Sequence, residues 1–281
     1  MKLLFITNSA EIAQFALESG VDRIFIDLEI LGKQQRQGHL DTLISRHALR
    51  DVARLRPVVP RGALLVRVNP VHDGTEEEVE QVVQSGADII MLPMFRGPRE
   101  VETFCSAVGG RARTCLLLET AGAMRSLKDC IAVPGVDEVH IGLNDLHLDL
   151  NLRFMFEPLA DGFVDDMAAI LRGASVPFGI GGLARVGEGL LPAEMILGEH
   201  ARLGSTQAIL SRTFHRQAKS VAEIRDQMDF GLEVERMRDA HAAFLTSSAS
   251  VLSANRAEVV HRIRDIASCL PLRRPGSGVD D

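Results

Sequence analysis

Short apolar runs alternate along the chain with longer segments that carry apolar residues at helical spacing. The runs occupy residues 3–7, 23–28, 63–68, 88–93, 115–118, 139–141, 177–180 and 204–210, and turn residues bound most of them. A short continuous apolar run of this kind is typical of a strand buried on both faces of a parallel sheet. Helices are predicted at residues 10–19, 43–55, 75–86, 99–108, 121–131, 163–171, 221–244 and 257–270, and in a segment that begins with Pro192.

Eight strands in alternation with helices, followed by further helices, predict a (β/α)₈ TIM barrel with extra C-terminal helices. A doubly wound open sheet is the rival fold, but it usually carries a G-x-G-x-x-G turn after its first strand. This chain has Thr7, Asn8 and Ser9 at that position. We therefore expect a catalytic barrel over residues 1–215, helices over 216–272 that complete the barrel or mediate oligomerisation, and a disordered polar tail over 273–281.

Composition and charge indicate which kinds of binding partner and which cellular location to expect. The chain has 281 residues, of which 46% are hydrophobic and 25% charged, and its formal net charge is −7. An acidic balance argues against nucleic-acid and anionic-membrane partners, because both need clustered Lys and Arg. The apolar segment after Lys2 is too short for a signal peptide, and no apolar run approaches a bilayer span. The four cysteines lack the spacing of metal or redox sites, so we expect reduced thiols in a cytoplasmic protein.

Polar side chains gather where four of the predicted strands end. In chain order they are Asp27 and Glu29 after the second strand, Arg67 and Asn69 at the third, Glu119 at the fifth, and Asn144 and Asp145 after the sixth. The carboxyl ends of barrel strands share one rim, where α/β proteins place their chemistry. Glu119 and Asp145 on successive strands would form half a site for a hard divalent cation. The alternatives are that Asp145 caps a short helix, or that both acids pair with arginines.

These strand ends also carry a family resemblance. The segments D-L-E, V-R-V-N, L-L-E-T and I-G-L-N-D-L resemble, in this order, those of the HpcH/HpaI aldolase and citrate lyase β-subunit superfamily, over about residues 3–215. The resemblance implies that Glu119 and Asp145 bind Mg²⁺, or Mn²⁺ or Co²⁺ in its place, and that Glu29 orders metal-bound water. It also implies that the substrate is held by Arg67 and by the backbone amides of Gly142, Leu143, Asn144 and Asp145.

The same resemblance implies a carbon–carbon lyase or aldolase that forms a pyruvate-type enolate. Its substrate would be a small 2-oxo acid such as pyruvate or oxaloacetate, with an aldehyde or an acyl-CoA as a further partner. The metal would act as a Lewis acid that stabilises the enolate. Lysine placement supports a metal independently, because an aldolase without one uses a Schiff-base lysine. None of the four lysines (Lys2, Lys33, Lys128 and Lys219) falls at the end of a predicted interior strand.

Two positions depart from the family pattern. Ile30 stands where the aldolases have a histidine base, and Leu117 stands where they have a glutamine. The proton-transfer group is therefore open. The candidates are Asp27, His72 and His147, whereas His140 within the sixth strand is expected to be a core residue.

The departures keep two other functions open. One is an acyl-CoA lyase like the citrate-lyase-like proteins, for which residues 96–99 (R-G-P-R) would supply a weak basic groove. The other is a catalytically weak barrel that serves as a binding or assembly subunit.

Two further features have alternative interpretations. The segment of Gly179, Ile180, Gly181 and Gly182 after the seventh strand is either a tight turn or a cradle for a phosphate or carboxylate. The amphipathic C-terminal helices either pack on their own barrel or, as the family resemblance implies, exchange between subunits of a homo-oligomer, a trimer or hexamer.

Overall fold

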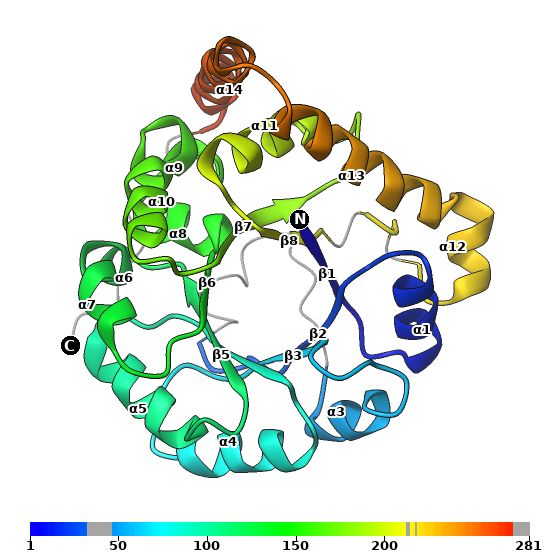
Figure 1. Cartoon of the computed structure of the whole chain (residues 1–281), viewed down its shortest axis with the longest axis vertical. Helices are drawn as coiled ribbons and strands as arrows, with labels where there is room; N and C mark the ends of the chain where they lie inside the picture. Colours follow the sequence, from blue (N-terminus) through cyan, green and yellow to red (C-terminus); the bar gives the residue numbers. More distant parts are fainter. Residues whose placement is uncertain (33–46, 212–213, 217, 272–281) are drawn as a thin grey trace.

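Eight parallel strands form a closed barrel, in the order in which they occur in the chain. The computed structural model describes residues 1–32, 47–211, 214–216 and 218–271. Figure 1 shows the strands as a central ring with the helices around it. The elements are β1 Lys2–Ile6, α1 Ala10–Glu18, β2 Arg23–Asp27, α3 Leu49–Leu55, β3 Leu64–Arg67, α4 Thr75–Gln84, β4 Ile89–Leu92, α5 Pro98–Val108, β5 Arg113–Leu118, α6 Ala121–Arg125, α7 Leu127–Ala132, β6 Glu138–Ile141, α8 Leu143–Asp149, α9 Glu157–Ala160, α10 Phe163–Gly173, β7 Phe178–Leu183, α11 Ala193–Leu203, β8 Gln207–Leu210, α12 Val221–Gln227, α13 Phe230–Leu245 and α14 Ala249–Cys269.

The predicted TIM barrel with extra C-terminal helices is confirmed. Strand β1 pairs with both β2 and β8, which closes the ring, and every neighbouring pair is parallel. Alternate strand residues point inward and outward, so one apolar cluster fills the barrel and a larger one joins the strands to the helices. The inner cluster consists of Leu4, Phe25, Leu65, Ile89, Met91, Cys115 and Leu117.

Polar contacts close the amino-terminal end of the barrel. The Arg23 guanidinium at the start of β2 donates across the interior to both oxygens of Glu138 on β6, at 2.5 and 3.1 Å. It also donates to Gln207 Oε1 on β8 at 2.9 Å. With this end occupied and the middle filled by apolar side chains, the carboxyl end is where a ligand can approach the interior.

Side-chain N-caps begin five of the described helices, α1, α6, α12, α13 and α14, whereas α4 begins without one. Ser9 caps α1 through Ile12 N–H, as expected from the sequence. Thr75 and Glu78 have the spacing of a capping box, but Gly74 is the N-cap of α4. Thr75 Oγ1 instead accepts from His72 N–H at 2.8 Å, and the Glu78 carboxylate accepts from Asn69. The predicted helix start is therefore confirmed, although Thr75 and Glu78 form no capping box.

The glycines near β7 lie within the strand, rather than in a turn after it. Gly179, Gly181 and Gly182 all belong to Phe178–Leu183, so the predicted turn after the strand is wrong, although the pairing of β7 with β8 shifts register between Gly179 and Gly182. A Cβ at Gly179 would lie 2.3 Å from His140 Nδ1, so the neighbouring side chain requires a glycine here. The buried imidazole of His140 therefore explains the glycine at position 179.

The C-terminal helices differ in length from the prediction. The segment 221–244 forms two helices, α12 and α13, because Asp229 caps a new start through Leu232 N–H at 3.0 Å. The last helix begins at Ala249, well before the predicted 257. None of the helices in the described ranges is long and apolar enough to span a bilayer.

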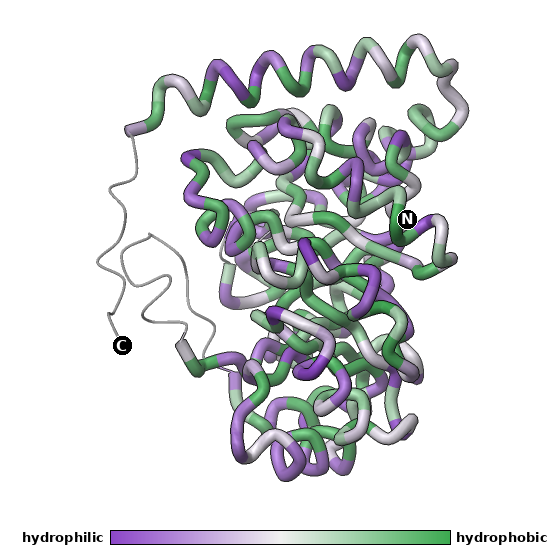
Figure 2. The backbone as a smooth tube through the Cα atoms, turned by 90° about the vertical axis from the view of Figure 1, so that its left-hand side faces the viewer, coloured by the Kyte–Doolittle hydropathy of each residue, from purple (hydrophilic) through white to green (hydrophobic). Residues whose placement is uncertain are grey.

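Helix α14 lies outside the ring of helices, beyond α11 and α13 in Figure 1. Figure 2 shows it along one edge of the molecule, with hydrophilic and hydrophobic residues interspersed along its length. Its buried residues are Val259, Ile263 and Ala267, a single stripe. Asn255 Nδ2 donates to Met195 O on α11 at 3.0 Å. In the single chain, α14 thus packs on its own barrel.

Some expectations fall outside the described residues. These are the part of the helix predicted from residue 43 that precedes 47, and the tail over 273–281. Helix α3 begins at Leu49. The division at residue 215 stays a prediction.

Candidate active site at the carboxyl ends of the strands

Asp27 and Arg67 form the centre of the candidate site. They are Cα partners in the register of β2 and β3. Arg67 Nε donates to Asp27 Oδ1 and Arg67 Nη2 to Asp27 Oδ2, both at 2.8 Å. Arg67 Nη2 also lies 3.3 Å from Glu29 Oε2. This is the forked geometry in which a guanidinium binds a carboxylate most strongly.

The predicted acids are all buried at this end. Asp27 is 1% exposed, Glu29 2%, Glu119 3% and Asp145 7%. Burying a carboxylate is costly unless a cation or hydrogen-bond donors hold it. Four of them at the carboxyl ends of β2, β5 and β6, on one rim of the barrel, therefore indicate a site organised around positive charge, not a set of solvated loop residues.

Arg67 remains charged in this setting. Burial opposes the charge on its guanidinium, but Asp27 and Glu29, and to a lesser extent Glu119, raise the pKa of Arg67 above its usual range. Among the residues that the structure describes, Arg67 Nη1 makes no hydrogen bond, whereas Nε and Nη2 are both engaged. Two acids hold the guanidinium in place, and one of its nitrogens remains for a further oxygen.

Glu119 is positioned by the end of β4 and faces the end of β6. Its Oε1 accepts from Met94 N–H at 3.2 Å. Met94 has a φ of +55°, a conformation that non-glycine residues adopt at a cost and that is concentrated at functional sites. A Cβ at Gly142 would lie 3.0 Å from Glu119 Oε2, so the absence of a side chain at Gly142 makes room for this carboxylate.

Asp145 lies in the first turn of α8, which begins directly after Gly142. Because β5 pairs with β6, Glu119 and Asp145 follow adjacent strands, as predicted. The Gly142 N–H donates to Leu118 O at 2.9 Å within the barrel. The N–H groups of Leu143, Asn144 and Asp145 lie in the first turn of α8, where a helix offers no carbonyl acceptor of its own. Of the four predicted substrate amides, the one of Gly142 thus has a partner in the sheet.

Two carboxylates fit one kind of metal site. Mg²⁺ is usually held by one or two carboxylates and keeps several waters or substrate oxygens, so Glu119 and Asp145 are a suitable donor set. Over the described ranges, no group of three or more His, Cys, Asp or Glu side chains is arranged to hold a metal. Zn²⁺ in a closed structural site, which needs four protein ligands, does not fit these residues.

The three histidines named from the sequence have different hydrogen-bond partners in the structure. His72 Nδ1 accepts from Gly74 N–H at 3.0 Å, and its Nε2 lies 3.1 Å from Glu78 Oε2, so it stabilises the start of α4. His147 is buried within α8, with Nδ1 3.3 Å from Leu143 O. Burial lowers the pKa of His140 to about 4, and its Nε2 lies 3.0 Å from Gly181 O. His140 is thus a neutral core residue, as predicted.

Sequence reasoning missed His47 at this site. Its Nδ1 accepts from Asp27 N–H at 3.0 Å. Strand β1 ends at Ile6, so His47 takes the place of a β1 carbonyl as the acceptor for this amide. No motif pointed to it, because the contact joins the segment before α3 to β2. The network of Asn69 and Glu78 beside Glu29 was missed for the same reason.

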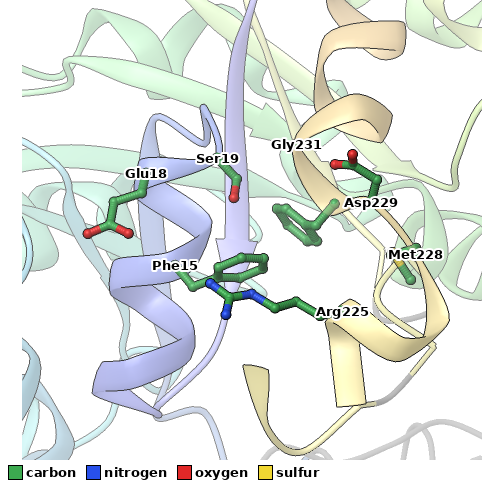
Figure 3. A pocket seen from close by; sticks show the side chains of 8 residues that line it. Phe15, Glu18, Ser19, Arg225, Met228, Asp229 and Gly231 are labelled. Atoms are coloured by element: carbon green, nitrogen blue, oxygen red, sulfur yellow. The ribbon is translucent and has the colours of Figure 1, made fainter. Parts of the chain in front are cut away.

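A separate hollow of about 500 Å³ lies on the outer surface, between α1 and the corner of α12 and α13. Figure 3 shows Phe15 and Arg225 side by side there, with the guanidinium 5.3 Å from the ring centroid. Its acids, Glu18 and Asp229, are exposed to solvent. The buried acids lie at the strand ends instead, so we locate the candidate active site there.

Comparison with known proteins gives the same family as the sequence motifs. A model of the HpcH/HpaI aldolase/citrate lyase family matches residues 2–155, more than half of the 281-residue chain. A search of curated protein sequences gave no match.

Solved structures share the fold. The crystal structure of an HpcH/HpaI aldolase from Desulfitobacterium hafniense superposes with a TM-score of 0.58 at 16% identity, over 75% of this chain and 85% of that one. An HpcH/HpaI aldolase/citrate lyase family protein from Burkholderia cenocepacia gives 0.59 at 17% identity, over 85% and 94%. The citrate synthase SbnG gives 0.57 at 16% identity, over 85% and 94%.

Proposed function

Because this chain belongs to the HpcH/HpaI aldolase/citrate lyase family, whose members include lyases, we propose that it is a divalent-metal-dependent carbon–carbon lyase or aldolase. Its substrate would be a small 2-oxo acid of the pyruvate or oxaloacetate type. The observation that carries the proposal is the Arg67 guanidinium, held by Asp27 and Glu29 among buried acids at the strand ends.

Glu119 and Asp145 would hold the metal, Mg²⁺ or in its place Mn²⁺ or Co²⁺. When bound, such an ion supplies a Lewis acid for the oxygens of the 2-oxo acid. The protein's own share is to keep both carboxylates in place. Glu119 is fixed by Met94 N–H, and Asp145 by its place in the first turn of α8.

The substrate would be bound from two sides. Arg67 Nη1 would donate to the carbonyl oxygen and, as charge develops there, to the enolate oxygen. The amides of Leu143, Asn144 and Asp145 at the start of α8 would receive the substrate carboxylate. We assign Gly142 a spacing role, because its N–H already donates to Leu118 O.

The proton-transfer group is best assigned to Glu29. Both Asp27 oxygens accept from Arg67, which makes Asp27 an anchor for the guanidinium. Glu29 lies beside Arg67 at the mouth of the barrel, with Oε2 3.3 Å from Arg67 Nη2. A carboxylate in this place can order water or pass a proton to the enolate carbon. Ile30, which replaces the family's histidine, is 66% exposed and carries no titratable group.

The acyl-CoA lyase has less support among the described residues. Arg96, the first residue of its expected basic groove, already pairs with Asp149, with Nη2 and Oδ1 3.4 Å apart. A catalytically weak binding subunit remains the alternative that an activity test decides.

The test is metal-dependent exchange of the methyl protons of pyruvate for deuterium, followed by proton NMR, with oxaloacetate decarboxylation as a second assay. Exchange needs only an enolate and a proton-transfer group, so it does not depend on knowing the acceptor. We expect exchange with Mg²⁺, Mn²⁺ or Co²⁺, none with a chelator, and loss in Glu119→Ala. Glu102→Ala on the exposed face of α5 is the matched control. If the wild-type protein with metal catalyses neither reaction, the enzyme proposal fails.

A further inference from the structure

We propose that Asn69 and Glu78 form a clamp that positions Glu29 at the mouth of the barrel. The inference rests on the proposed function, since it gives Glu29 the proton-transfer role. Asn69 and Glu78 do not touch the reacting atoms. They are positioning residues that act through the backbone after Glu29.

Asn69 joins the end of β3 to the backbone that leaves β2. Its Oδ1 accepts from Ile30 N–H and from Leu31 N–H, both at 2.9 Å. Its Nδ2 donates to Glu78 Oε1 at 2.7 Å, and its backbone N–H lies 3.2 Å from the same oxygen. The amide side chain therefore bridges two elements.

Glu78 is fixed from its other side. His72 Nδ1 accepts from Gly74 N–H, so the neutral ring carries its proton on Nε2, which lies 3.1 Å from Glu78 Oε2. The Glu78 carboxylate thus receives hydrogen bonds at both oxygens, from Asn69 and from His72. A charged acceptor strengthens these bonds relative to neutral pairs.

The chain needs such a clamp at this point. Glu29 is 2% exposed, whereas Ile30, the next residue, is 66% exposed and Leu31 is 44% exposed. Within one residue the backbone passes from the buried site to solvent, and the side chains of Ile30 and Leu31 are poorly packed. Hydrogen bonds to Asn69 therefore take over the positioning that core packing provides elsewhere.

The first variants separate the two roles of the Asn69 side chain, in which Oδ1 accepts from the backbone and Nδ2 donates to Glu78. Asn69→Ala removes the acceptor for both backbone amides. Asn69→Asp keeps that acceptor but places a carboxylate against Glu78. In the double variant Asn69→Asp with Glu78→Gln, the introduced amide can donate to the introduced carboxylate, so the pair is restored with its polarity reversed. Glu77→Gln is the matched control, because Glu77 lies on the exposed face of α4 and accepts from Gln81.

Three measurements are made on each folded variant, with thermal unfolding as the check on folding. They are hydrogen–deuterium exchange of the segment that contains Ile30 and Leu31, Mn²⁺ affinity by electron paramagnetic resonance, and kcat and KM for metal-dependent proton exchange of pyruvate. In Asn69→Ala we expect faster amide exchange and a kcat lower by roughly 10- to 100-fold, with little change in Mn²⁺ affinity. The kcat of Asn69→Asp should lie between those of wild type and Asn69→Ala. The double variant should recover more than half of the decrease in log kcat that Asn69→Asp shows.

The outcomes distinguish the clamp from the proposed function. If wild type does not exchange pyruvate protons, the proposed function fails, and amide exchange alone then decides whether the clamp exists. Unchanged amide exchange in Asn69→Ala overturns the clamp. Unchanged kcat, or a loss that appears only in Mn²⁺ affinity, overturns its effect on Glu29.

Discussion

Asp27 and Arg67 face each other across the register of β2 and β3 and share two hydrogen bonds of 2.8 Å. The pair fixes both the direction of the guanidinium and the position of one of the buried acids. It is therefore both a structural element of the barrel mouth and the support of the proposed substrate contact.

Replacing Arg67 by Lys tests this double role. Lys keeps the charge but loses the fork, so Asp27 loses one of its two hydrogen bonds from the guanidinium and no nitrogen reaches the substrate oxygen. We expect kcat of pyruvate exchange to fall by roughly 100-fold or more. Unfolding free energy should fall as well, by less than the roughly 3–5 kcal/mol of a fully broken buried pair. Arg99→Lys on exposed α5 is the control. Activity equal to wild type would exclude Arg67 from the reaction.

A methyl group at Gly142 tests the space beside Glu119. The added Cβ would lie 3.0 Å from Glu119 Oε2 and 3.1 Å from its Cβ, so the carboxylate has to move. We expect Gly142→Ala to weaken Mn²⁺ binding by roughly tenfold, because displaced ligands bind less well. Gly173→Ala is the control, since a Cβ there meets nothing within 4 Å. Equal Mn²⁺ titrations of the two variants would contradict the prediction.

Stability should depend on pH through buried histidines. Burial lowers the pKa of His140 to about 4 and that of His200 to about 3, from 6.5. Below pH 6.5 the unfolded chain binds more protons than the folded one, so this stability is present above pH 6.5 and lost as the pH falls toward 4. As the pH falls from 7 to 5, protonation of each of these two histidines in the unfolded chain should lower the free energy of unfolding by about 2 kcal/mol. Urea unfolding of His200→Gln should show a smaller decrease over that range, and an identical decrease would contradict the prediction.

The oligomeric state is a separate prediction. Helix α14 buries one stripe on its own barrel, and Val251 near its start is 46% exposed. We expect the purified chain to form a homo-oligomer, a trimer or hexamer, that covers part of this helix. Light scattering coupled to gel filtration measures the mass directly, and removal of α14 should reduce it. A monomeric wild-type chain would contradict the prediction.

Much of the barrel could be predicted because its local signals agree with its tertiary structure. Apolar runs become strands, and the acids that follow them, such as Glu119 and Asp145, fall at one end because all strands are parallel. The family resemblance is likewise confirmed by the family match. The metal, the substrate and the cytoplasmic location stay predictions.

The rest depended on contacts that sequence order does not reveal. His47 reaches Asp27 from the segment before α3, and Asn69 reaches Ile30 from the neighbouring strand. Gly179 resembled a turn residue, although a buried imidazole occupies the space of its missing side chain. The break at Asp229 was the exception, since an acid before an apolar helix start is a readable capping signal. The continuous apolar periodicity concealed it.

The most direct test of the proposed metal site is a crystal soaked with Mn²⁺ and oxalate, measured at a wavelength where manganese scatters anomalously. We predict one anomalous peak at the carboxyl ends of the strands, with an oxygen of Glu119 and one of Asp145 about 2 Å from it. Arg67 should lie on the opposite side of the oxalate. A peak that lacks either carboxylate, or no peak at this end of the barrel, would contradict the prediction.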